Sequence, residues 1–210
     1  MNKKVNIIVD STADITEDVK ERLTVVPLTL RFEDEEYIEG VTIQKKEFYQ
    51  KLIESDVLPK TSQAVPADFS DIFEKIAAAG ESAVVITLSS KLSGTWQSAM
   101  IAAREYEDSV YVVDSRSVAI GAAILAKLAL RLVDEGMGAR EIAERLEKER
   151  EKICLIAMLD TLEYLKKGGR ISAAAAFAGG VLSIKPVVCI RDGEIVILGK
   201  ARGSKQGNNL

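Results

Sequence analysis

The stretch from Ala83 to Thr95, A-V-V-I-T-L-S-S-K-L-S-G-T, gives the strongest indication of the fold. Its first part, Ala83 to Leu88, is apolar and rich in β-branched residues, which is typical of a buried strand. A polar loop follows, and a helix is predicted from Ser93 to about Glu105. A buried strand that leads through a short loop into a helix is the repeating unit of a parallel α/β sheet.

The same strand-then-helix order occurs on both sides of this stretch. Val5 to Val9 is a short apolar run, and Pro66 begins a helix with apolar residues at helical spacing. Val110 to Val113 predicts a further strand, and Val118 to Val133 predicts a buried helix. We therefore expect a parallel α/β domain over residues 1–155.

Between the first strand and Pro66 the pattern is less regular. Thr16 to Leu23 predicts a short amphipathic helix, and Val25 to Phe32 predicts a strand around Pro27. A turn then leads to Tyr37-Ile38, so residues 25–38 resemble a hairpin. This hairpin could pair with a second domain.

The second domain is expected to be α+β with antiparallel strands. Ile153 to Leu159 is a continuous apolar strand, and Asp160 is placed to cap a following helix. The Ala-rich run from Ser172 to Val181 predicts another helix. Asp192-Gly193 lies between two apolar runs, which is the strongest short signal for a hairpin.

The composition excludes several classes of function. With 28 basic and 32 acidic residues the formal charge is -4, so no positive excess favours nucleic acid. The absence of histidine removes Ser–His and Cys–His catalysis and the commonest metal ligand. The longest apolar tract, Val118 to Val133, is shorter than the ~20 residues of a membrane span. We expect no metal site, no nucleic-acid partner and no transmembrane segment.

The cysteines and the N-terminus indicate a cytoplasmic protein. Cys154 and Cys189 both lie in apolar, strand-like runs, as expected for buried thiols in a reducing compartment. Met1 to Val5 contains two lysines, but no long apolar stretch comes before Asp10, so no secretory signal is expected.

Polar residues follow the predicted strands at Asp10–Thr12, Ser89–Ser90 and Asp114–Ser115. In open α/β sheets ligands bind outside the carboxyl ends of strands, although such residues also cap helices. The loop to Thr95 is more informative, because Ser93 would lie at a helix N-terminus. Free N–H groups and the positive dipole end favour an anion there. Simple capping by Ser93 remains an alternative.

Basic and hydroxyl residues elsewhere are ambiguous alone. Lys166 to Arg170 closes a predicted helix, where basic residues usually complement the dipole and Gly-Gly usually forms the C-cap. Arg170 could instead hold an anion. Lys200 to Gly203 is basic in the same way, and Thr61 to Gln63 is a loop with hydroxyl groups.

These segments occur in a characteristic order along the whole chain. They are Asp10-Ser11-Thr12-Ala13-Asp14, Thr61-Ser62-Gln63, Ser89-Ser90-Lys91-Leu92-Ser93-Gly94-Thr95-Trp96-Gln97-Ser98-Ala99, Asp114-Ser115, Lys166-Lys167-Gly168-Gly169-Arg170-Ile171 and Lys200-Ala201-Arg202-Gly203. Each motif is weak alone, but in this order and spacing they resemble the DegV family.

The resemblance implies an α/β domain and an α+β domain that hold a long-chain fatty acid, with no other cofactor. It implies a non-catalytic protein, since some DegV proteins are the binding subunit of an ATP-dependent bacterial fatty acid kinase that makes acyl phosphate. By resemblance, Thr61, Ser93 and the N–H of Gly94 are the carboxylate ligands. Arg170 is implied beside the head group, and Arg202 in partner docking or phosphoryl transfer. Such a carrier allows transient contact with a membrane.

The chain also departs from the family pattern. Ala64-Val65 stand where the family usually has Pro and a small residue, and Trp96 where Tyr is common. Family chains continue past Leu210 with more helix and strand, including a histidine, so we expect the second domain, residues 156–210, to be incomplete. The alternatives are an α/β transferase that binds a small phosphorylated ligand at the Ser93 helix terminus, and a truncated DegV relative without function.

Overall fold

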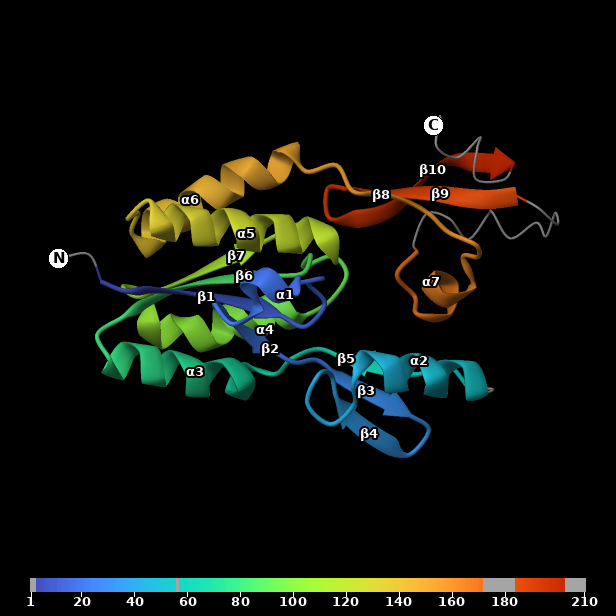
Figure 1. Cartoon of the computed structure of the whole chain (residues 1–210), viewed down its shortest axis with the longest axis horizontal. Helices are drawn as coiled ribbons and strands as arrows, with labels where there is room; N and C mark the ends of the chain where they lie inside the picture. Colours follow the sequence, from blue (N-terminus) through green and yellow to red (C-terminus); the bar gives the residue numbers. More distant parts are fainter. Residues whose placement is uncertain (1–2, 56, 172–183, 203–210) are drawn as a thin grey trace. The chain divides into compact units, whose positions relative to one another are not determined.

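The structure, a computed structural model, describes residues 3–55, 57–171 and 184–202. The chain divides into two compact units, Met1–Ile153 and Cys154–Leu210. Figure 1 shows the helices and strands of each unit. The division lies close to the domain boundary expected at residue 155.

The first unit is built on a four-stranded parallel sheet. Its strands are β1 (Val5–Asp10), β2 (Leu23–Val26), β6 (Ser82–Thr87) and β7 (Val110–Asp114), in the order β2-β1-β6-β7. Every residue of β6 is buried, because a central parallel strand is covered on both faces. The predicted α/β class is confirmed.

Helices cover both faces of this sheet. They are α3 (Pro66–Ala78) and α4 (Thr95–Ala103) on one face, and α5 (Ile120–Asp134) and α6 (Ala139–Glu149) on the other (Figure 1). Successive strand residues point to opposite faces. Val85 accordingly packs in the cluster of Phe73, whereas Ile86 packs in the cluster of Leu125.

Several helix ends differ from the predictions. The helix α1 spans only Glu17–Lys20, because Leu23 already pairs with Ile7 in the sheet. The helix α5 begins at Ile120, two residues later than predicted, with Ala119 as its N-cap. Short 3-10 turns, Arg104–Tyr106 and Arg150–Lys152, follow α4 and α6.

A second, antiparallel sheet of the first unit contains the predicted hairpin. Its strands are β3 (Thr29–Phe32), β4 (Glu35–Ile38) and β5 (Lys60–Ser62), in the order β4-β3-β5, and α2 (Lys45–Glu54) accompanies them. The expected strand over Val25–Phe32 is wrong, because Pro27 separates β2 from β3 and has no N–H to donate. Both neighbours of β3 come from the first unit, whereas the sequence also allowed pairing with the second domain.

The second unit contains a three-stranded antiparallel sheet and a short helix. Its elements are β8 (Ile156–Met158), α7 (Glu163–Lys167), β9 (Ile184–Arg191) and β10 (Glu194–Arg202), with the strands in the order β10-β9-β8. Asp192 and Gly193 form the predicted two-residue turn, with φ of 51° and 83°. Both positive values match the type I′ turn that Asp-Gly favours.

Three predictions for the start of this unit are wrong. The strand β8 covers only Ile156–Met158, with Ile156 half-exposed, and Cys154 is exposed whereas Cys189 is buried. Asp160 does not cap α7: it pairs with Lys185 at 2.7 Å. The helix predicted at residues 172–181 lies outside the described residues. In the described part of the chain, no helix has the length and apolar character to cross a membrane.

Candidate functional site

The loop from β6 to α4 carries the predicted anion site. The helix begins at Thr95 with Gly94 as its N-cap, so Ser93 lies just before the helix and not inside it as predicted. The Ser93 side chain is half-buried, and its Oγ accepts the Thr95 N–H at 3.3 Å and lies 3.0 Å from the Thr95 Oγ1. The N-cap position itself is occupied by Gly94 without a side-chain hydrogen bond, and the Ser93 hydroxyl contacts the first helical residue at the end where an anion would be favoured.

Two carboxylates, from β1 and β7 on either side of β6, hold this loop in place. Oδ2 of the buried Asp10 accepts the Leu88 N–H at 2.6 Å, and Oδ1 of Asp114 accepts the Ser90 N–H at 3.2 Å. Burial raises the pKa of Asp10, and hydrogen bonds from Thr12 and Leu88 partly oppose this effect. The polar residues at the ends of β1 and β7 therefore both reach the loop that follows β6. The carboxylates of Asp10 and Asp114 accept hydrogen bonds from backbone N–H groups of this loop.

The predicted segment Thr61–Gln63 is joined to the same helix start. Thr61 lies on β5, exposed, and its Cα partner in β3 is Leu30. The Nε2 of Gln63 donates to Oγ of Ser98 in α4 at 3.1 Å. The Gln63 amide also lies against Gly94, since a methyl group at position 94 would overlap its Oε1. Gln63 thus connects the strand of Thr61 with the turn that carries Ser93.

The two predicted arginines both lie in the second unit. Arg170 follows Gly169, whose φ is 71°, at the end of α7, and its Nη1 donates to the Gly168 carbonyl at 2.5 Å. Arg202 is the last residue of β10 and pairs with Ile184 of β9. Both side chains are exposed. The predicted residues thus form two groups, one in each unit.

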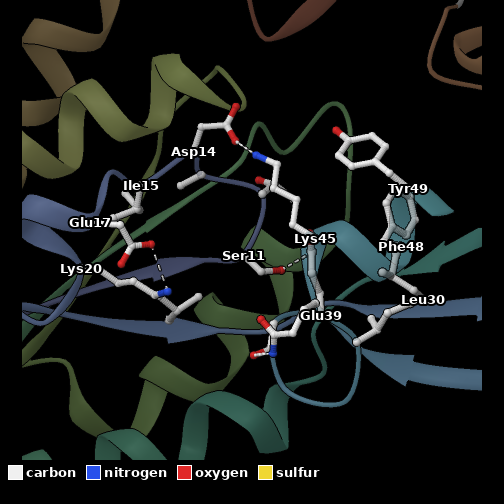
Figure 2. A pocket seen from close by; sticks show the side chains of 16 residues that line it. Ser11, Asp14, Ile15, Glu17, Lys20, Leu30, Glu39, Lys45, Phe48 and Tyr49 are labelled. Atoms are coloured by element: carbon white, nitrogen blue, oxygen red, sulfur yellow. Dashed lines mark hydrogen bonds and ion pairs between the residues drawn. The ribbon is translucent and has the colours of Figure 1, made fainter.

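A cleft of about 450 Å³ in the first unit contains residues that the sequence did not single out. Figure 2 shows Ser11 pointing toward Glu39, with Lys45 reaching Asp14. The Ser11 Oγ donates to Glu39 Oε2 at 2.6 Å and accepts the Leu28 N–H at 2.9 Å. Burial raises the pKa of Glu39, while the Ser11 hydroxyl acts in the opposite direction.

The cleft combines polar groups at the end of β1 with an apolar side from β3 and α2. Leu30, Phe48 and Tyr49 contribute the apolar side (Figure 2). Ser11 was visible in the sequence as a polar strand end. Glu39 was not, because it reaches Ser11 only after the hairpin folds back onto the parallel sheet. Among the described residues, no group of His, Cys, Asp and Glu could hold a metal ion.

Comparison with known proteins identifies the family. Residues 4–209 match the model of a family described as "Uncharacterised protein, DegV family". A DegV domain-containing protein of Caldanaerobacter subterraneus subsp. tengcongensis is 38% identical over 208 residues, which cover 97% of this chain and 74% of that protein.

Solved structures of the same family share the fold. A DegV family protein from Thermus thermophilus, described for its fatty acid binding, aligns with a TM-score of 0.88 and 33% identity over 100% of this chain and 75% of its own. A stearic acid-binding protein from Eubacterium ventriosum aligns with a TM-score of 0.84 and 29% identity, covering 100% of this chain and 73% of its own. The family model and the curated relative together leave one conclusion: this chain belongs to the DegV family.

Proposed function

We propose that this protein binds a long-chain fatty acid, buries its acyl chain and holds the carboxylate with Thr61, Ser93 and the N–H of Gly94. The observation that carries the proposal is the junction of β5 with the start of α4. There Gln63 connects the strand of Thr61 to the turn of Ser93 and Gly94. Structural relatives described as fatty acid binding support the same class of ligand.

The chemistry of the junction suits a carboxylate. The first N–H groups of a helix have no partner within the helix, and the positive end of its dipole favours an anion. The hydroxyl of Ser93 adds a donor, and its Oγ is already oriented by Thr95. A hydrogen bond to a charged group contributes about 1.5–3 kcal/mol.

The acyl chain would supply most of the affinity. Each buried methylene contributes about 0.8 kcal/mol, so roughly 15 methylenes contribute about 12 kcal/mol. This sum exceeds the lower estimates, several kcal/mol, of the free energy that association costs in lost translational and rotational freedom. The carboxylate contacts then determine the direction in which the acid lies.

The residues of the proposed site can be tested directly. In Ser93→Ala and Thr61→Val, affinity for stearic acid should fall roughly 10- to 150-fold each, the equivalent of one charge-assisted hydrogen bond. The double variant should lose less than the sum, because both hydroxyls bind one anion. Isothermal titration with delipidated protein measures the affinities, and native mass spectrometry of the purified protein should find bound acid.

Two control variants remove similar hydroxyls elsewhere. Ser109→Ala removes a half-buried hydroxyl that donates to the Tyr106 carbonyl before β7, and Thr24→Val removes an exposed hydroxyl on β2. Both should bind stearic acid like the wild type. Wild-type affinity in the Ser93/Thr61 double variant would refute the site. Preferential binding of a phosphorylated small molecule at Ser93 would favour a transferase instead.

We further propose that the bound carboxylate is presented to an ATP-dependent fatty acid kinase in the cytoplasm, with Arg170 and Arg202 beside the head group or the partner. Both arginines are exposed, and Arg170 follows the glycine pair that ends α7. In Arg170→Ala, stearic acid affinity should be unchanged while acyl-phosphate formation with a cognate kinase stops. Loss of lipid binding as large as in Ser93→Ala would instead make Arg170 a ligand of the acid.

A further inference from the structure

The contact between Gln63 and Gly94 is a close fit between a side chain and a glycine. A methyl group at position 94 would overlap the Gln63 Oε1 and lie 2.7 Å from its Cδ and 2.9 Å from its Nε2. The glycine is not required by its backbone, because its φ of -77° and ψ of 3° are open to other residues. A side chain at position 94 would therefore have to displace the amide of Gln63, which is an exposed residue.

The same amide is fixed at its other end. Its Nε2 donates at 3.1 Å to Oγ of Ser98, which lies one helical turn after Gly94 and is 2% exposed. Ser98 also donates its own N–H to the Gly94 carbonyl at 3.0 Å. Gln63 thus contacts the first turn of α4 at two successive levels. A shift of the amide along the helix would break its bond to Ser98.

Gln63 follows directly after β5, the strand that carries Thr61. Ala64, directly after Gln63, is buried in the core. Backbone movement at Gln63 is therefore limited on both sides, by the pairing of Ser62 with Thr29 and by the buried Ala64.

We infer that Gln63 is a positioning residue whose amide, seated on Gly94 and bonded to Ser98, sets the separation between Thr61 and Ser93 for a carboxylate. This inference rests on the proposed function for its ligand. Gln63 does not bind the acid: it holds two groups that do. Gly94 accordingly has two roles, as an N–H donor and as the surface that receives the amide.

The first test needs no ligand and uses Gln63→Ala, Gly94→Ala and the double variant in urea unfolding. Gly94→Ala should destabilise the wild type, because the amide has to leave its place. In the Gln63→Ala background the same change should be neutral or stabilising, because the methyl group fits and glycine's unfolded-state entropy is reduced. Additive effects of the two substitutions would overturn the inferred contact.

The second test compares stearic acid with methyl stearate, which has the same tail but no carboxylate charge. In Gln63→Ala, affinity for the acid should fall roughly three- to tenfold, the equivalent of one ordinary hydrogen bond, while affinity for the ester stays unchanged. An equal loss for both ligands would show general damage and overturn the positioning role. A wild type that binds neither ligand would refute the proposed function, whereas the unfolding cycle alone decides whether the amide occupies Gly94.

Discussion

Replacing Asp10 with Asn should loosen the loop that leads to Ser93. The two carboxylate oxygens of Asp10 accept three hydrogen bonds: Oδ2 from the Leu88 N–H at 2.6 Å, and Oδ1 from the Thr12 N–H at 3.0 Å and the Thr12 hydroxyl at 2.5 Å. An asparagine has only one oxygen, so its NH₂ group would face a backbone N–H of Leu88 or Thr12.

The expected loss of unfolding free energy follows from the one backbone N–H donor that loses its acceptor. A buried N–H without a partner costs about 1–3 kcal/mol. Burial raises the pKa of Asp10, so removing the charge returns part of this cost. We expect the lost acceptor to outweigh the gain, because every oxygen of Asp10 has a donor. Asp10→Asn should therefore be less stable by about 1–3 kcal/mol.

Urea unfolding and amide hydrogen exchange would measure the effect. Exchange at Leu88 should accelerate in Asp10→Asn, and stearic acid affinity should fall because Ser93 is less well placed. Asp14→Asn is the matched control: Asp14 is exposed and pairs with Lys45 at 3.5 Å, a surface ion pair of about 0–1 kcal/mol. Equal stability of the two variants, with unchanged exchange at Leu88, would refute the reasoning.

Three further outcomes are expected from the packing and the titrating groups. Burial raises the pKa of Glu39 above its ordinary 4.5, so the unfolded state loses its proton first as pH rises and the folded wild type is destabilised at neutral pH. Glu39→Gln should therefore be more stable than the wild type at neutral pH and should lose this advantage in acid, which urea unfolding at both pH values would measure. Gly121→Ala should destabilise, since its methyl group would overlap the Ser117 Oγ, and Ser117→Ala should rescue it in thermal unfolding. Phe73→Ala should cost about 3–5 kcal/mol in urea unfolding, because the ring is fully buried in the core between α3 and the sheet, and a loss below 1 kcal/mol would contradict this packing.

The sequence predicts the parallel sheet well because burial determines its pattern. The apolar run that became β6 is buried throughout, and Asp192-Gly193 forms its turn from local backbone preference alone. The errors occur where distant contacts decide. Pro27 separates two strands of different sheets, and Cys154 is exposed although its neighbours are apolar. Neither outcome follows from the local pattern.

The sequence names residues for the candidate site but not their arrangement. Ser93 and Thr61 could be identified from family motifs, yet their relation depends on β5 pairing with β3, a contact between residues far apart in sequence. The binding of Leu88 by Asp10 was hidden for the same reason: a polar strand end predicts that a carboxylate is near a loop, not which N–H it accepts. Glu39 gave no signal, because only the folded hairpin brings it to Ser11.

The contact of the Gln63 amide with Gly94 has a consequence for the evolution of this protein. A lineage that substitutes Gly94 first passes through an overlap with Gln63, whereas one that first shortens Gln63 meets no such barrier. The mutational path between the two states is therefore ordered, and each substitution changes the fitness effect of the other. Homologues with a side chain at position 94 should carry a smaller residue at position 63, a covariation that ancestral reconstruction could date.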